Sequence, residues 1–260
     1  MTGLAGTAAF APRAIPLFSV VVPMWNEEES FATTVGVLLA ACDALVTDRS
    51  VESYELVLVD DCSTDSTGAL GDAAAAADPR IRVVHHEQNL GLGGSIRTGL
   101  GDARGDLVLY TDADLPFDVF ELPRLVRLMQ VYDAGILSAW RMDRHSEGFR
   151  RTVYSAIYNA LVRVLLRLRV RDVNFACKII RREVLDDVEL RSTGSFIDAE
   201  LIARANRRGH KIIQVGIDYF ARSVGLSTLS SFRTIRGILR EMFSMSGEIR
   251  KLRPPTTAPG

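Results

Sequence analysis

The sequence predicts an α/β protein built on a mostly parallel, doubly wound sheet. Short apolar runs, many of them β-branched, alternate with segments of helical apolar spacing from Phe18 to Ala139. Such alternation places consecutive strands in one sheet and their helical crossovers on its two faces. The length of 260 residues is enough to bury a substantial core around that sheet.

Each element follows from a local pattern, in chain order. Apolar runs that stop at polar or turn residues predict strands, and amphipathic or Ala-rich stretches predict the helices between them. After Trp140 the pattern changes to two basic, apolar helical stretches around a region of mixed character. The expected strands are 18–22, 54–59, 81–84, 106–111 and 134–139, and the expected helices are 31–45, 66–77, 95–103 and 119–131.

Composition disfavours several classes of protein. A formal net charge of −1 gives no basis for nucleic-acid binding. The three cysteines have neither paired spacing nor a partnering His cluster, which favours a reduced, cytoplasmic protein over a disulfide framework or a zinc site. We expect residues 1–16 to form a flexible tail rather than a signal peptide, and residues 254–260 to be disordered.

An acidic pair closes the apolar run 107–111. Side chains alternate along a strand, so Asp112 and Asp114 lie on one side with small Ala113 between them. Two carboxylates placed in this way can share Mg²⁺ or Mn²⁺ with the phosphates of a substrate. Aspartate is also a common turn residue, so the pair alone fits a solvated turn equally well. The residues at the other strand ends distinguish the two interpretations.

Four of the expected strands end in polar or glycine-rich segments. The carboxyl ends of parallel strands meet at one edge of a sheet, where open α/β sheets bind ligands. Single residues of this set also suit helix caps or tight loops, but the whole set at one edge indicates a binding site. The glycine-rich segment 89–95 has neither the G-x-G-x-x-G order nor the Lys of a P-loop, which disfavours dinucleotide and Walker-type sites.

Together these motifs resemble inverting family-two glycosyltransferases with the GT-A fold. Further motifs at 138–141, 172–178, 196–200 and 222–227 are similar to the polyprenyl-phosphate branch, such as dolichol-phosphate mannose or glucose synthases. The resemblance covers residues 18–230, within an expected glycosyltransferase domain of residues 17–230. The residues that carry it are Val20-Val21-Val22-Pro23 with Asn26-Glu27, then Val59-Asp60-Asp61-Cys62-Ser63-Thr64-Asp65, then Asn89-x-Gly91-x-Gly93, and Asp112-x-Asp114.

Two positions depart from the family pattern. Cys62 stands where the second motif carries glycine, so the turn must hold a side chain in left-handed geometry. Pro116 stands where mannose synthases place a Gln that helps to hold the metal, and proline cannot bind one. The metal would then rely on Asp112, Asp114, water and diphosphate, which leaves the donor and the preferred metal open.

The resemblance implies transfer of a hexose from a GDP- or UDP-sugar to a polyprenyl phosphate, with inversion at the anomeric carbon. A Mg²⁺ or Mn²⁺ ion on Asp112 and Asp114 would stabilise the departing nucleoside diphosphate as a Lewis acid. A phosphate acceptor is already ionised, so it needs cations rather than a base. The implied donor-binding residues are Pro23, Asn26, Glu28, Asp61, Asn89, Gly91, Gly93, Asp112 and Ala113; the acceptor-binding residues are Arg141, Lys178, Arg222 and Ser227; the catalytic residues are Asp114, Arg141, Asp198 and Arg222.

Asp198 is compatible with a second function. With a phosphate acceptor it would bind sugar hydroxyls or orient an Arg, whereas a soluble family-two enzyme with a hydroxyl acceptor, a glycan or natural product, would use it as base. Its place at the start of a helix also suits the helix dipole alone. The neighbouring Glu200, two residues on, faces another way. A third function, from another class, is an inactive protein that binds nucleotide sugars.

Two basic stretches, 149–169 and 231–253, predict amphipathic helices that lie in a membrane interface. Their arginines recur too often for a membrane span, and anionic lipid attracts each nearby Arg by about 1 kcal/mol. Ordinary helices with Arg facing solvent, or a dimer contact, would give the same pattern. We therefore expect a peripheral protein on the cytoplasmic, inner face of an anionic membrane. The sequence does not determine whether a separate subunit anchors it to the membrane.

Overall fold

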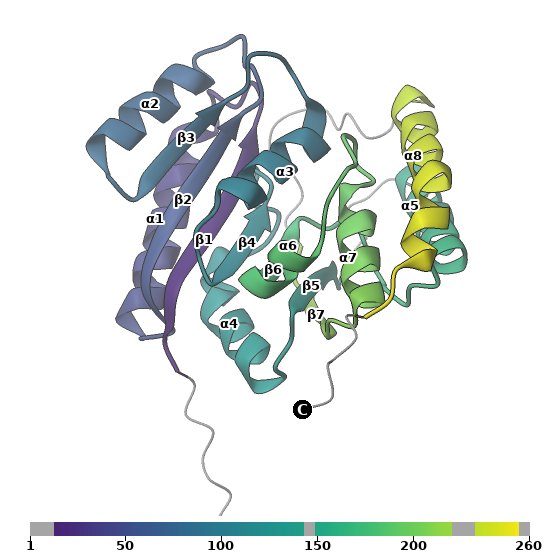
Figure 1. Cartoon of the computed structure of the whole chain (residues 1–260). Coiled ribbons are helices and arrows are strands. Elements are labelled where there is room, and N and C mark those ends of the chain that lie inside the picture. The colour runs from purple at the N-terminus through teal and green to yellow at the C-terminus, as the bar shows by residue number, and fades with distance from the viewer. Residues whose placement is uncertain (1–12, 143–148, 220–231, 255–260) are drawn as a thin grey trace, which may run out of the picture.

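A seven-stranded sheet forms the centre of the protein in this computed structural model, which describes residues 13–142, 149–219 and 232–254 (Figure 1). Its strand order is β3-β2-β1-β4-β6-β5-β7, and every pair is parallel except those of β6, which runs antiparallel to β4 and β5. The expected α/β, mostly parallel sheet is confirmed. The strands are β1 (Ile15–Met24), β2 (Val51–Asp60), β3 (Ile81–His85), β4 (Leu107–Thr111), β5 (Ile136–Arg141), β6 (Cys177–Arg181) and β7 (Ile212–Ile217).

Helices cover both faces of the sheet, as Figure 1 shows. Strand alternation supplies both cores: Val20 and Val22 face the core under α1 and α4, whereas Val21 faces the core under α3, α6 and α7. The helix α2 packs against β2 and β3. The helices are α1 (Phe31–Thr47), α2 (Thr67–Ala77), α3 (Gly91–Asp102), the short 3-10 helix η1 (Val119–Glu121), α4 (Leu122–Val131), α6 (Arg182–Asp187) and α7 (Ile197–Arg208).

Two further helices, α5 (Phe149–Leu166) and α8 (Phe232–Lys251), lie side by side beyond α7 (Figure 1). They share a third core with α7, in which Val162, Ile202 and Met242 are buried. Both basic stretches are therefore helical, and one side of each is occupied by protein. In the described part of the chain, no helix combines the length and apolarity that a membrane crossing requires.

Several boundaries differ from the sequence-based expectations. The strand β1 begins at Ile15, within the expected tail of residues 1–16. The glycine-rich segment is not a loop before a helix at 95, because α3 already begins at Gly91. The expected helix 119–131 is divided into η1 and α4, with Pro123 in the first turn of α4. Most of the two expected flexible ends, residues 1–12 and 255–260, lies outside the described residues.

Gly99 allows α3 to lie close to the sheet. A Cβ atom at this position would come within 2.3 Å of Val21 Cγ1 and 3.1 Å of Val59 Cγ2. The contact fixes the distance of α3 from β1 and β2, and so fixes where its first turn meets the strand ends. Two residues later, Gly101 has no heavy atom within 4 Å of its Cβ position.

We predict that Gly99→Ala lowers the free energy of unfolding by about 2 kcal/mol, because the added methyl overpacks a dense core. Gly101→Ala is the matched control in the same helix, and it should be neutral or stabilise by up to about 1 kcal/mol through helix propensity. Urea unfolding of the two variants measures the difference. Equal stability of the two variants would contradict the close packing of α3 on the sheet.

Candidate active site

The loops that follow β1 and β2 interlock at the carboxyl edge of the sheet. The Asn26 backbone N–H donates to Ser63 Oγ (3.0 Å), and the Asn26 side-chain oxygen accepts from the Thr64 N–H (2.8 Å). A Glu28 carboxylate oxygen accepts from the Ser66 N–H at 3.0 Å. These exposed polar side chains are thus held in place beside half-buried Pro23, at the end of β1. Their contact with a donor stays a prediction.

Cys62 adopts the left-handed geometry that its position in the motif requires. Its φ is 59°, and its thiol lies 3.7 Å from the Glu87 carbonyl oxygen. Asn26 in the opposing loop is also left-handed, with a φ of 54°. Both loops therefore accept non-glycine residues in this conformation, which costs Cys62 about 1–2 kcal/mol, whereas asparagine adopts it more readily. Such strain is held by the surrounding hydrogen bonds.

Asp61 joins the end of β2 to the first turn of α3. One carboxylate oxygen accepts from the Leu90 N–H (2.8 Å) and contacts His86 Nδ1 (2.7 Å), and the other accepts from the Gly91 N–H (2.9 Å). Asn89 adds a bond from its side-chain nitrogen to the Asp61 carbonyl oxygen at 3.2 Å. Asp61 is buried, so the structure gives it the task of positioning the glycine-rich turn. Direct donor contact by Asp61 stays a prediction.

Asp60, one residue earlier, braces the same loop. It accepts from the Ser63 N–H (3.0 Å) and contacts His85 Nδ1 (2.9 Å), while His85 Nε2 contacts Asp72 (3.0 Å). Burial acts to raise the pKa of Asp60, but the hydrogen bonds from Ser63 and His85 prevail and lower it. In return, Asp72 and Asp60 raise the pKa of His85. Asp60 therefore stays charged and keeps the Ser63 turn in place.

The acidic pair lies at the end of β4, with Asp112 and Asp114 half-buried. The backbone between them is fixed, because Thr34 Oγ1 of α1 donates to the Ala113 carbonyl oxygen at 2.7 Å. A tight turn follows, in which Leu115 has a φ of 44° and its N–H donates to the Asp112 carbonyl oxygen at 3.2 Å. The chain therefore bends away at once and leaves the two carboxylates at the strand end.

The donor set of this pair suits a hard divalent cation such as Mg²⁺ or Mn²⁺. Carboxylate oxygens are the ligands that such ions prefer, and both ions keep water and substrate oxygens in their shell. The described residues contain no group of three or more His, Cys, Asp or Glu side chains that could hold a metal. Asp112 and Asp114 would therefore bind an ion together with a diphosphate rather than enclose it alone.

The buried side chain of Tyr110 contacts Asp112 of the acidic pair. Its hydroxyl donates to an Asp112 carboxylate oxygen at 3.3 Å, and its ring is fully buried in β4. Burial, followed by the Asp112 charge, raises the pKa of Tyr110 well above its usual value. The hydroxyl therefore keeps its proton and orients Asp112. Sequence reasoning missed this residue, although the alternation 110, 112, 114 along one strand indicates it.

Lys178 and Asp198 form an ion pair in the interior. Lys178 is 0% exposed, and its ammonium lies 2.5 Å from Asp198 and 2.8 Å from the Phe175 carbonyl oxygen. Burial raises the pKa of Asp198, and the neighbouring Lys178 opposes that shift. Breaking a buried pair costs about 3–5 kcal/mol. The structure thus does not bring Lys178 to the acceptor side, and it gives Asp198 a cation as partner rather than access to a hydroxyl.

Arg141 lies at the carboxyl end of β5, on the same edge as the acidic pair. Asp172 accepts a bidentate pair from it, from Nε at 2.7 Å and from Nη2 at 3.1 Å. The guanidinium also lies over the rings of Phe175 and Tyr219, with centroid distances of 5.7 and 5.2 Å. These contacts fix its orientation. Arg222 and Ser227, the other expected acceptor residues, lie outside the described residues.

Glu200 has a separate role from Asp198, as the spacing of two residues predicted. It is fully buried, pairs with Arg204 at 2.7 Å, and accepts from the backbone N–H groups of Arg191 and Ser192. This carboxylate therefore organises the segment that precedes α7 rather than the strand edge.

Residues 19–189 match the family model described as glycosyl transferase family 2. The chain belongs to this family. Its fold is accordingly that of the GT-A glycosyltransferases, as the motifs at the strand ends implied. The match includes the interlocked loops, the glycine-rich turn, the acidic pair and Arg141, which all lie between residues 19 and 189.

Three relatives illustrate the likeness. The glycosyltransferase AglD of Haloferax volcanii is 35% identical over 208 residues, which are 77% of this chain and 32% of AglD. An undecaprenyl-phosphate 4-deoxy-4-formamido-L-arabinose transferase of Aeromonas hydrophila is 36% identical over 174 residues, 66% of this chain and 51% of that protein. The polyprenol monophosphomannose synthase of Mycolicibacterium smegmatis is 33% identical over 225 residues, 81% of this chain and 80% of that protein. The chain thus spans only a third to a half of the first two.

Solved structures share the architecture. Glucosyl-3-phosphoglycerate synthase of Mycobacterium tuberculosis, in complex with Mn²⁺, UDP and glucosyl-3-phosphoglycerate, superposes with a TM-score of 0.66. The superposition covers 93% of this chain and 82% of that chain at 24% identity. At this identity the likeness concerns the fold alone.

We predict that Tyr110→Phe weakens the apparent affinity for Mn²⁺ by about tenfold, because it removes the hydroxyl that orients Asp112. The measurement is the Mn²⁺ concentration needed for half-maximal binding of a nucleoside diphosphate. Tyr132→Phe, at a side chain that is 51% exposed, is the control and should leave the metal requirement unchanged. An unchanged requirement in Tyr110→Phe would exclude a supporting role for the hydroxyl.

Proposed function

We propose that this chain transfers a hexose from a nucleotide sugar to a polyprenyl phosphate at a membrane surface, with the help of a divalent metal. The observation that supports the proposal is the common edge of Asp112, Asp114 and Arg141, at the carboxyl ends of β4 and β5, which are separated in the sheet by β6 alone. The names of the relatives support the acceptor class, since two of them act on undecaprenyl phosphate or make polyprenol monophosphomannose.

The donor would lie across the interlocked loops and the acidic pair. Asn26, Glu28 and Asn89 would contact the base and ribose, and Gly91 with Gly93 would leave room for close approach of the donor. Asp112 and Asp114 would hold Mg²⁺ or Mn²⁺ on the diphosphate. The bound ion supplies Lewis-acid stabilisation of the charge that develops on the leaving group.

The acceptor chemistry follows from the charges of the site. An ionised lipid phosphate can attack the anomeric carbon without a base, but the two anions repel each other as they approach. Arg141, oriented by Asp172, would offset this repulsion, with Arg222 and Ser227 as further acceptor contacts. Asp198 supports this choice over a hydroxyl acceptor, because the carboxylate that would act as base is buried against Lys178.

We predict that wild-type protein forms a glycolipid from polyprenyl phosphate and one member of a panel of GDP- and UDP-sugars, detected by mass spectrometry. Asp114→Ala should lose at least about 100-fold in turnover, because metal stabilisation is worth several kcal/mol. Asp133→Asn, at a side chain that is 92% exposed, is the control for removal of an acidic charge.

Three outcomes would contradict the proposal. Full turnover in the presence of EDTA would exclude a metal requirement. Transfer to a hydroxyl acceptor alone would favour the soluble enzyme that modifies a glycan or natural product. Donor binding without any transfer would favour an inactive nucleotide-sugar-binding protein.

The neighbouring helices α5 and α8 supply the proposed membrane contact. Val164 is 73% exposed and Phe243 is 59% exposed. The exposed Arg163 is adjacent to Val164, and the exposed Arg240 lies three residues before Phe243. Apolar and cationic side chains together suit the headgroup region of an anionic bilayer. An acceptor phosphate at that level could reach the catalytic edge from the inner face of the membrane. A separate anchoring subunit would be compatible with the same surface.

We predict that the chain pellets with anionic vesicles at low salt and is released as salt screens the charges. Arg240→Ala should weaken vesicle binding about fivefold, which corresponds to about 1 kcal/mol for one arginine near the surface. Arg104→Ala, an exposed arginine in the connection from α3 to β4, removes the same charge and should bind like wild type. Failure to pellet under every condition would exclude the peripheral location for this chain.

A further inference from the structure

The segment 191–194, which precedes α7, lies directly against the glycine-rich turn. The Gly93 N–H donates to the Thr193 carbonyl oxygen at 3.0 Å. A Cβ atom at Gly93 would come within 2.6 Å of the Thr193 carbonyl carbon, and one at Gly91 within 3.1 Å of its oxygen. Gly93 therefore allows this close backbone contact, besides any role in donor binding, while Gly91 also has a left-handed φ of 74° that favours glycine.

A single carboxylate of α8 holds the other side of this segment. Glu241 accepts from Ser192 Oγ at 2.6 Å and from the Gly194 N–H at 3.3 Å. It also accepts from both the N–H and the hydroxyl of Thr193, each at 3.1 Å. Four donors thus converge on one side chain that comes from a helix far along the chain. None of the motifs in the sequence indicates Glu241.

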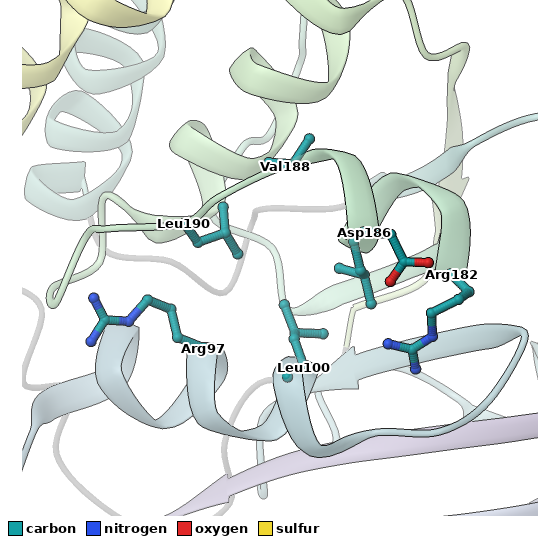
Figure 2. Close-up of a pocket in the computed structure, with 8 residues that line it drawn as sticks. Arg97, Leu100, Arg182, Asp186, Val188 and Leu190 are labelled. Carbon is teal, nitrogen blue, oxygen red and sulfur yellow. The ribbon is translucent and has the colours of Figure 1, made fainter.

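The remaining supports of the segment are polar as well. Glu200 accepts from the Arg191 N–H at 3.0 Å, and Arg97 Nη1 of α3 donates to the Arg191 carbonyl oxygen at 3.1 Å. A pocket of about 220 Å³ lies between α3, α6 and the preceding residues Val188 and Leu190 (Figure 2). The pocket lies beside the segment, and residues 192–194 themselves are held by the hydrogen bonds to Glu241 and Gly93.

We infer that Glu241 is a positioning residue of the donor site, through which α8 holds residues 192–194 against Gly91 and Gly93 and thereby sets the affinity for the nucleotide sugar. The inference rests on the proposed donor site. Without Glu241, the donors of Ser192, Thr193 and Gly194 lose their common acceptor, and the glycine turn loses a fixed neighbour. Donor binding would then have to order the turn, which lowers the apparent affinity.

Trp25 offers a direct probe. It is 50% exposed in the loop after β1, next to Asn26, and the chain has one other tryptophan, Trp140. Titration of the tryptophan fluorescence with GDP and with UDP, each in Mn²⁺, measures binding without an acceptor. We expect Glu241→Ala to weaken binding of the preferred nucleotide about tenfold. Glu241→Gln keeps one carbonyl acceptor for the backbone N–H groups, so its nucleotide affinity should lie between those of the wild type and Glu241→Ala.

Glu248→Gln is the matched control on α8. It removes the same charge, but Glu248 contacts the side chains of Arg191 and Arg204 rather than the backbone of the segment. Its nucleotide affinity should stay within about twofold of wild type, even where its thermal midpoint falls. In the transfer assay, Glu241→Ala should raise the donor KM about tenfold and leave kcat within about twofold.

The outcomes separate this inference from the proposed function. Folded Glu241→Ala or Glu241→Gln protein with wild-type nucleotide affinity overturns the inference, even where the wild type makes glycolipid. A loss of nucleotide affinity in Glu241→Ala, with no transfer to polyprenyl phosphate by the wild type, supports the inference and contradicts the acceptor. Absence of nucleotide binding by the wild type would overturn both.

Discussion

The buried carboxylate of Asp61 is the contact on which the rest of the site depends. Its side chain fixes the Leu90 and Gly91 N–H groups, and its own backbone N–H donates to the Met24 carbonyl oxygen at 2.9 Å. One residue therefore ties β1, β2 and the start of α3 together. From there the connection continues through Gly93 and Thr193 to α8. A buried charge is stable only when its oxygens are satisfied, so these positions are mutually constrained.

Much of this arrangement follows from the sequence. Parallel strands end at one edge, and alternation put Asp112 and Asp114 on one side, so the positions of the acidic pair and of Arg141 could be predicted. The left-handed turn at Cys62 followed from its place in the motif. The helix start at Gly91 did not, because glycine opposes helix formation in isolation. The left-handed φ of 74° at Gly91 and the close approach of Gly93 to Thr193 explain these glycines.

The failures of prediction concern partners far apart in the chain. Lys178 was expected to bind the acceptor, but β6 enters the sheet antiparallel between β4 and β5 and carries Lys178 into the interior opposite Tyr110. No local pattern shows that insertion or the pairing with Asp198. Glu241 was missed for the same reason, since its partners lie 47 to 49 positions away in the sequence. An apolar helix with scattered charges does not reveal which carboxylate turns inward.

The central claim is that the end of β4 holds the metal and the diphosphate of the donor. The most direct test is anomalous diffraction from crystals grown with Mn²⁺ and the nucleoside diphosphate that the protein binds. We predict one anomalous peak within about 2.0–2.3 Å of oxygens of Asp112 or Asp114 and of the diphosphate. An anomalous peak away from Asp112 and Asp114, or a bound diphosphate away from the acidic pair, would contradict the account.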